Sequence, residues 1–166
     1  MPGNGIVLLT PEFLNKQYFM AQFKRSASAV WRGNGPDGSG VLNGPSGLLS
    51  DTPYSAAKRF QNEDGKAGTN PEELIAAAHA GCYAMALSFA LTNAGFVPEE
   101  LSCEATIDME KGDSGWGFKQ ITLNLQASVP GIDEQKFMEL AKGAKSGCPV
   151  SKALSAVPIE LNAALK

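Results

Sequence analysis

Apolar and polar residues alternate one by one along three stretches in the second half of the chain. These stretches are residues 103–109, 121–129 and 157–165, and apolar residues occupy nearly every second position. A period of two is typical of a β-strand that buries one face. Glycine, aspartate and serine at 112–115 separate the first two stretches and indicate a turn. We therefore predict three strands with one buried face each.

Residues 71–93 follow a different pattern, with apolar side chains on every face beyond the first turn. Thr69 or Asn70 is suited to cap the start of a helix, Pro71 suits its first position, and Gly95 suits its end. A helix that is apolar all round is typically enclosed by protein. The pattern predicts a long, buried, central helix.

The remaining segments complete an α+β fold. A second helix is predicted from about Asp133 to Gly147, and a short one begins at Pro149. Strand-like pieces near 23–31, 40–42 and 54–60, separated by turn sequences rich in Gly, Asn and Pro, predict an antiparallel meander. The fold class is α+β, with antiparallel sheets around the long helix.

Composition narrows the class of protein. The chain of 166 residues suits one domain, predicted to span residues 22–166, whereas residues 1–21 carry no clear period and read as an N-terminal extension. A net charge of −3 without a basic stripe argues against a nucleic-acid partner. The apolar run at 75–91 is shorter than the roughly 20 residues of a membrane span, and residues 1–21 lack a signal-peptide pattern. We expect a cytoplasmic protein without a membrane partner.

The cysteines are the leading candidates for covalent chemistry. Three cysteines are too few for a secreted disulfide framework. Cys148 precedes Pro149 at a helix start, where free N–H groups favour a thiolate, so local chemistry makes it the more reactive thiol. Cys82, inside the long helix, is, taken on its own, better interpreted as a small, unreactive core hydrophobe. Cys103 lies on the apolar side of a strand and reads as structural.

Other ionisable groups have simple structural interpretations. His79, the only histidine, lies among alanines and reads as a hydrogen-bonded core residue. One His and scattered Cys lack the short paired spacings of a zinc site, so we expect no metal and no cofactor. Glu72 suits the first turn of a helix, where an acid complements the dipole. Arg59 is interpreted either as a surface cation on a strand or as a partner for a thiolate.

Several motifs together resemble one known family. They are TNPEELI at 69–75, AHAGC at 78–82, AGF at 94–96, VPGID at 129–133 and GCPVS at 147–151. From about Gln22 to Lys166 the chain is similar to the OsmC branch of the OsmC/Ohr superfamily. Members are thiol-dependent peroxidases that reduce organic hydroperoxides to alcohols.

The resemblance implies an intertwined homodimer with its sites at the subunit interface. It implies that Cys82 attacks the peroxide and becomes a sulfenic acid, that Cys148 resolves it as a Cys82–Cys148 disulfide, and that Arg59 and Glu72 are catalytic. The implied partners are an organic hydroperoxide and a dithiol reductant, in this family typically a lipoylated protein.

Helix geometry adds one expectation. Glu72 and Cys82 are separated by roughly 15 Å along a straight helix, so they cannot touch within one subunit. We therefore expect the second subunit to supply Glu72 to the site. Two alternatives stay open: a non-catalytic protein that binds an apolar ligand, and a thiol redox sensor that uses the disulfide as a switch.

Overall fold

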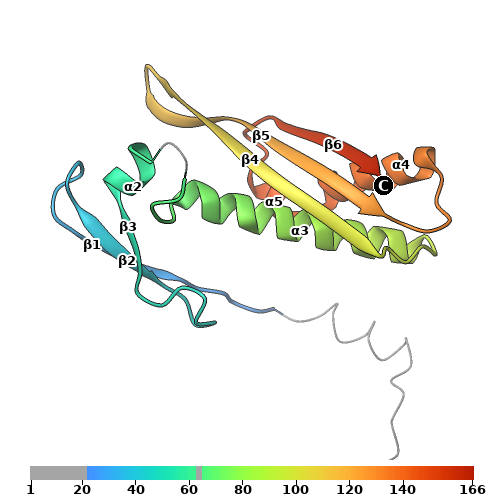
Figure 1. Ribbon diagram of the computed structural model, residues 1–166, viewed down its shortest axis with the longest axis horizontal. Helices are drawn as coiled ribbons and strands as arrows, with labels where there is room; N and C mark the ends of the chain where they lie inside the picture. Colours follow the sequence, from blue (N-terminus) through green and yellow to red (C-terminus); the bar gives the residue numbers. More distant parts are fainter. Residues whose placement is uncertain (1–21, 63–64) are drawn as a thin grey trace, which may run out of the picture.

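The computed structural model describes residues 22–62 and 65–166, and the predicted extension at 1–21 lies outside the described residues. A long helix runs beside a C-terminal sheet, and a smaller sheet lies beyond the N-terminal end of that helix (Figure 1). The elements are, in chain order, β1 (Ser28–Arg32), β2 (Ser39–Asn43), β3 (Thr52–Ser55), α2 (Ala56–Phe60), α3 (Pro71–Asn93), β4 (Glu100–Gly112), β5 (Gly115–Ser128), α4 (Glu134–Gly147), α5 (Pro149–Ala153) and β6 (Ile159–Leu165).

The C-terminal sheet has the strand order β4-β5-β6. The alternating pattern predicted its buried face correctly: Ile121, Leu123, Leu125 and Ala127 of β5 are at most 1% exposed. The long β4–β5 hairpin is antiparallel, as predicted. β6, however, pairs with β5 in parallel, so the prediction of purely antiparallel sheets is wrong. Because α4 and α5 carry the chain back across the sheet, β6 enters it in the same direction as β5.

α3 begins and ends where the sequence predicted. The side chain of Asn70 accepts a hydrogen bond from the backbone N–H of Glu73 at 2.8 Å, and Pro71 occupies the first turn, where its missing N–H costs nothing. After the helix, Gly95 has φ = +89°, a left-handed conformation that glycine adopts without strain. These two ends set the length of the helix.

Only one face of α3 is buried in the chain. His79, Tyr83, Leu87 and Leu91 are buried at intervals of four and pack with β4, α4 and α5. On another face Met85 is 62% exposed, and Phe89, four residues further, is 58% exposed. The prediction that α3 is enclosed on every face is therefore wrong for the described residues, because Met85 and Phe89 are exposed.

α3 is also the one helix in the described part of the chain that is long and apolar enough to cross a membrane. Only length and composition support a membrane-spanning helix here, and a core helix of a soluble protein has the same properties. The side chains at His79, Tyr83, Leu87 and Leu91 pack against protein, which accounts for the apolar composition on that face.

The N-terminal sheet has the order β1-β2-β3 and is antiparallel throughout, as predicted for the meander. The predicted strand at 54–60 is wrong in part: β3 ends at Ser55, whose hydroxyl accepts from the N–H of Lys58 and starts the one-turn helix α2. Arg59 therefore lies on a helix and not on a strand. The short side-chain cap, invisible to a periodicity argument, makes this difference.

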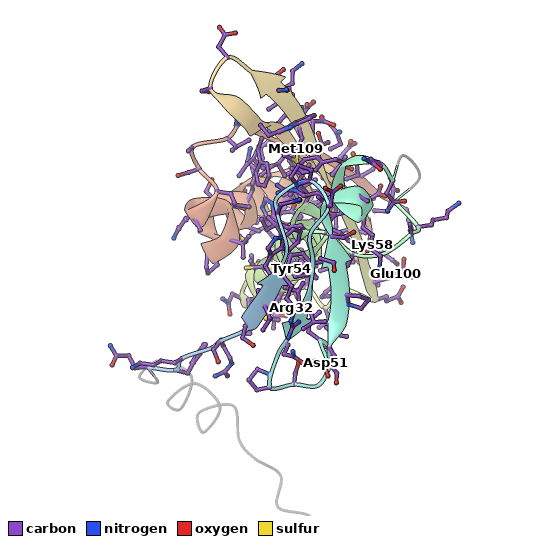
Figure 2. The ribbon with its side chains drawn as sticks, turned by 90° about the vertical axis from the view of Figure 1, so that its left-hand side faces the viewer. Arg32, Asp51, Tyr54, Lys58, Glu100 and Met109 are labelled. Atoms are coloured by element: carbon purple, nitrogen blue, oxygen red, sulfur yellow. The ribbon has the colours of Figure 1, made fainter. Side chains whose placement is uncertain are left out.

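The N-terminal sheet stands apart from the rest of the chain. Every residue of β1 is exposed, and within residues 22–62 and 65–166 this sheet makes only sparse contacts with α3 and the elements that follow. Figure 2 shows Arg32 and Tyr54 on this sheet and Asp51 in the loop just before β3, in front of the C-terminal elements. The sheet thus lacks a large partner surface among the described residues of its own chain.

Candidate functional site

The fold brings together two thiols that are 66 residues apart. Cys82 of α3 and Cys148, at the start of α5, share a hydrogen bond with a Sγ–Sγ distance of 3.0 Å. Both are free thiols. Cys148 is 0% exposed, whereas Cys82 is half-buried. A peroxide from solvent therefore has better access to Cys82, and Cys148 lies behind it.

Cys148 occupies the joint between two helices. Its backbone N–H donates to the carbonyl of Ala144 at the end of α4, and its own carbonyl accepts from the N–H of Lys152 in α5. Pro149 takes the first position of α5, and the N–H of Ser151 points at the Cys148 sulfur, at 3.5 Å. These contacts hold the sulfur towards α3.

The two thiols differ in acidity. Burial and the hydrogen bond with Cys148 raise the pKa of Cys82. Burial also raises the pKa of Cys148, but hydrogen bonds from Cys82, Ser151 and Val150 outweigh it, so the pKa of Cys148 is lowered overall. Within one chain Cys148 is thus the better thiolate, as local sequence chemistry predicted, although it is the less accessible sulfur. Cys82 lacks a cation beside it in the described part of its own chain.

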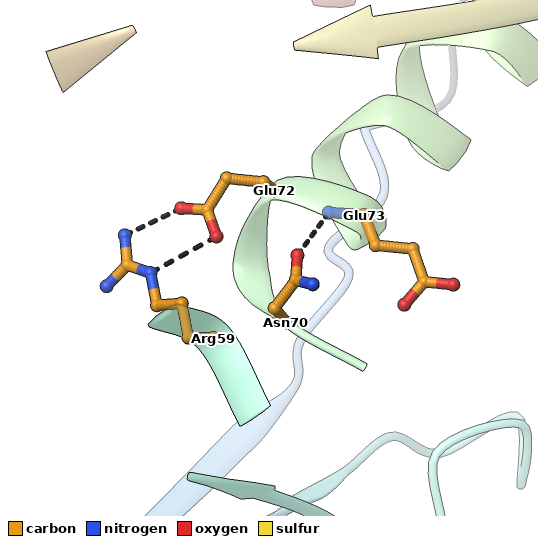
Figure 3. Close-up of polar contacts among 4 residues, drawn as sticks. All are labelled: Arg59, Asn70, Glu72 and Glu73. Atoms are coloured by element: carbon orange, nitrogen blue, oxygen red, sulfur yellow. Dashed lines mark hydrogen bonds and ion pairs between the residues drawn. The ribbon is translucent and has the colours of Figure 1, made fainter. Parts of the chain in front are cut away.

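Arg59 and Glu72 form a second cluster (Figure 3). The Nε and NH2 groups of Arg59 donate to the two carboxylate oxygens of Glu72 at 3.1 and 2.6 Å. This fork-to-fork pairing fixes the plane of the guanidinium, and the Glu72 side chain is only 14% exposed. The pairing joins α2 to the first turn of α3.

Aromatic rings flank the same guanidinium. The Arg59 carbon Cζ lies 4.8 Å from the centre of the Phe60 ring, which stacks on Trp116 of the β4–β5 hairpin with 5.5 Å between ring centres. Phe60 is 48% and Trp116 54% exposed, so this part of the cluster faces outward. Rings at such distances attract a cation and each other.

One chain does not unite all four predicted site residues. Cys82 and Cys148 form one pair, and Arg59 with Glu72 forms another at the N-terminal end of α3. Because Glu72 is ten residues before Cys82 on the same helix, the pairs are separated by roughly 15 Å along its axis. The roles of the four residues remain predictions.

A buried polar pair lies next to Cys148. His79 is 0% exposed, as predicted for a core residue, and burial lowers the pKa of its imidazole, which favours the neutral form. Its Nε2 lies 2.8 Å from the hydroxyl oxygen of Ser151. Ser151 was not singled out from the sequence, although its position three residues after the capping residue Cys148 is the signal of an N-cap contact.

Cys103 and possible metal ligands complete the inventory. Cys103 packs on the core, and burial raises its pKa to about 11, which keeps it a thiol at neutral pH. Residues 22–62 and 65–166 contain no group of three or more His, Cys, Asp or Glu side chains that could hold a metal ion.

Comparison with known proteins places the chain in a family. A family model described as OsmC-like protein matches residues 63–162. Peroxiredoxin OsmC of Escherichia coli (strain K12) is 42% identical over 132 residues, which are 80% of this chain and 90% of that protein. The organic hydroperoxide resistance protein OhrB of Bacillus subtilis is 34% identical over 91 residues, 55% of this chain and 65% of that protein. The chain belongs to the OsmC-like family, which confirms the resemblance seen in its motifs.

Solved structures agree with this assignment. The crystal structure of Bacillus subtilis OhrB covers 85% of this chain and 98% of its own, with a TM-score of 0.59 and 27% identity. A Legionella pneumophila structure, described as an organic hydroperoxide resistance protein OsmC, has a TM-score of 0.64 over 87% of this chain and 99% of its own. At 24% identity the second match supports the fold alone.

Proposed function

We propose that this chain is a thiol-dependent peroxidase that reduces organic hydroperoxides to alcohols. The observation that carries the proposal is the 3.0 Å approach of Cys82 and Cys148. A pair of reduced thiols at this separation, one partly exposed and one buried, suits a cycle of oxidation and disulfide formation. The names of the relatives, Peroxiredoxin OsmC and organic hydroperoxide resistance protein, point to the same chemistry.

The first step uses Cys82. Its thiolate attacks the terminal oxygen of the hydroperoxide, a sulfur–oxygen bond forms, and the oxygen–oxygen bond breaks. The leaving alkoxide takes a proton and departs as the alcohol, and Cys82 is left as a sulfenic acid. Met85 and Phe89 follow Cys82 by three and seven residues on α3 and are exposed, so they lie on the same side of the helix, where apolar side chains would favour an organic tail over hydrogen peroxide.

The second step uses Cys148. Its sulfur attacks the sulfenic sulfur, a sulfur–sulfur bond forms, and water leaves. An external dithiol then reduces the disulfide by thiol exchange, which closes the cycle. We place the chain in the cytoplasm, where dithiols are kept reduced, with a lipoylated protein as the reductant.

The proposal includes a homodimer in which the two clusters of different subunits meet. Burial raises the pKa of Cys82, and within the described residues no cation is among the groups that shift it, so the attacking thiol needs a cation from elsewhere. Arg59, oriented by Glu72, would supply that cation from the partner. The expectation that the partner supplies Glu72 thus extends to Arg59, since the two side chains form one unit.

The dimer would also cover the surfaces that one chain leaves open. The outward side of α3 and the detached N-terminal sheet are apolar in part and exposed in a single chain. Exposed apolar surface of this kind is typical of a protein interface.

A charged side chain introduced on the exposed side of α3 tests whether that side forms the dimer interface. Met85→Glu is expected to shift a wild-type dimer towards monomer and to lower peroxidase activity in parallel, because burying a lone carboxylate in an interface is costly. Sedimentation velocity at micromolar concentration measures the shift. Gln135→Glu, on the exposed side of α4, adds the same charge and is expected to leave the dimer intact. A monomeric and fully active wild type would refute the proposed arrangement.

The activity itself is tested by turnover with dihydrolipoamide as the dithiol. Cumene hydroperoxide is expected to be consumed catalytically, and at least about tenfold faster than hydrogen peroxide at equal concentration, because one buried organic group adds binding energy. Cys103→Ala is a control that should retain the rate. Absence of turnover with both peroxides would reject the enzyme in favour of a ligand-binding protein or a redox sensor.

A further inference from the structure

His79 and Ser151 form a polar pair inside an apolar core. The two-step peroxidase cycle gives this pair no role. Tyr83 and Cys148, both 0% exposed, belong to that core, and Ser151 is 6% exposed. The imidazole Nε2 and the Ser151 oxygen are 2.8 Å apart, while the other ring nitrogen, Nδ1, is buried without a partner in the described part of the chain. A buried polar pair needs a physical reason, because it costs free energy when it is incompletely satisfied.

The missing partner of Nδ1 indicates which nitrogen carries the proton. A neutral imidazole has one N–H and one bare nitrogen. If the proton were on Nδ1, an N–H donor would be buried without an acceptor, which is rarer and costlier than a bare acceptor. The favoured tautomer therefore carries its proton on Nε2 and donates to the oxygen of Ser151.

This direction leaves the Ser151 hydroxyl proton free for another acceptor. The adjacent acceptor is Cys148: the backbone N–H of Ser151 lies 3.5 Å from its sulfur, and the Ser151 side chain is among the groups that lower the pKa of that thiol. A hydroxyl that accepts from an imidazole is polarised and becomes a better donor. The order of donation then runs from His79 to Ser151 to Cys148.

We propose that Ser151 and His79 are positioning residues for the resolving thiol, and that they hold the Cys148 thiolate ready to attack the Cys82 sulfenic acid. This inference rests on the proposed peroxidase function. In that step Cys148 is oxidised and the sulfenic sulfur is reduced, while the departing hydroxide takes up the proton that the Cys148 thiol released. Among the described residues His79 has no onward partner for a proton, so it orients the hydroxyl and does not carry the proton away.

Ser151 also reaches the surface. Together with Lys145 and Lys152 it borders an open surface groove of about 350 Å³. The other titratable groups near Cys148 are Cys82 and Tyr83 on α3 and Cys103 on β4, and burial raises the pKa of each of these three.

The first test separates the two chemical steps in a single turnover. Reduced protein is mixed with one equivalent of cumene hydroperoxide, and peroxide loss and disulfide formation are followed separately. Ser151→Ala is expected to form the disulfide about tenfold more slowly, with Cys82 sulfenic acid captured by dimedone, because a hydrogen bond to a charged sulfur is lost. Ser155→Ala, an exposed serine just beyond α5, is the matched control.

Variants of His79 separate positioning from folding. His79→Gln keeps an N–H donor near the place of Nε2 and is expected to retain most of the disulfide rate, whereas His79→Leu should behave like Ser151→Ala. Equal disulfide rates in wild type, Ser151→Ala and His79→Leu would overturn the inference. A drop in thermal stability alone, with unchanged rates, would also overturn it.

A second readout does not depend on peroxidase activity. In a protein that also carries Cys82→Ser and Cys103→Ala, Cys148 is the remaining thiol. The thiolate absorbance at 240 nm then follows the ionisation of Cys148. Adding Ser151→Ala is expected to raise the pKa of Cys148 by about one unit. An unchanged pKa would overturn the inference, whereas a wild type that consumes no peroxide yet shows this shift would refute only the proposed function.

Discussion

Cys82→Ser is expected to reduce peroxide consumption by at least about a thousandfold, while Cys148→Ser still consumes one equivalent of peroxide. A serine hydroxyl is not ionised at neutral pH, so it cannot replace the attacking thiolate. Cys148 is 0% exposed and lies behind Cys82, so its loss should spare the first step and block disulfide formation. Steady-state turnover with a dithiol should then fall in both variants, for different reasons.

Mass spectrometry after one equivalent of cumene hydroperoxide distinguishes the two variants. Cys148→Ser should gain one oxygen at Cys82 and react with dimedone, and Cys82→Ser should remain unmodified. Loss of peroxide consumption only in Cys148→Ser would reverse the roles. The lowered pKa of Cys148 would favour that reversal, whereas the better solvent access of Cys82 favours the proposed roles. The experiment therefore shows whether acidity or solvent access determines which thiol attacks the peroxide.

Arg59→Met is expected to lower kcat/KM by about a hundredfold. Burial raises the pKa of Cys82, and a neighbouring guanidinium would lower it by one to three units, with a matching gain in thiolate at neutral pH. The pH profile should therefore shift upward in the variant, with activity recovered partly at alkaline pH. Arg32→Met removes an exposed arginine of β1 and is the control.

Mixed dimers reveal which subunit supplies the cation. Arg59→Met and Cys82→Ser chains, each inactive alone, are co-expressed with different tags. If a site combines the thiols of one subunit with Arg59 of the other, half of the dimers carry one intact site, and about a quarter of wild-type activity returns. If each chain builds its own site, activity does not return, and the intersubunit arrangement is refuted.

The long helix α3 could be predicted from the sequence because the residues that begin and end it are local signals. Asn70, Pro71 and Gly95 act within one turn of the residues they cap. The direction of β6 could not, because alternation gives the buried face of a strand but not its neighbour or its orientation. The helix at Arg59 was missed because a single turn is too short to show a period of 3.6.

The site was only partly accessible to sequence reasoning. Local chemistry identified Cys148, but the approach of Cys82 depends on how α3 packs with α5, which no spacing along the chain records. The assignments of Arg59 and Glu72 came from family resemblance, and their ion pair joins α2 to the first turn of α3. Ser151 escaped notice because a serine after a helix start is ordinary.

The exposed N-terminal sheet affects how the peroxide-removing capacity depends on the concentration of the protein. A three-stranded sheet with few contacts of its own is only marginally stable, and α2 with Arg59 follows directly from β3. If the partner chain provides the surface on which this sheet settles, the number of complete sites depends on encounters between chains. At low abundance, peroxide-removing capacity would then fall with roughly the square of chain concentration, and doubling synthesis would about quadruple it.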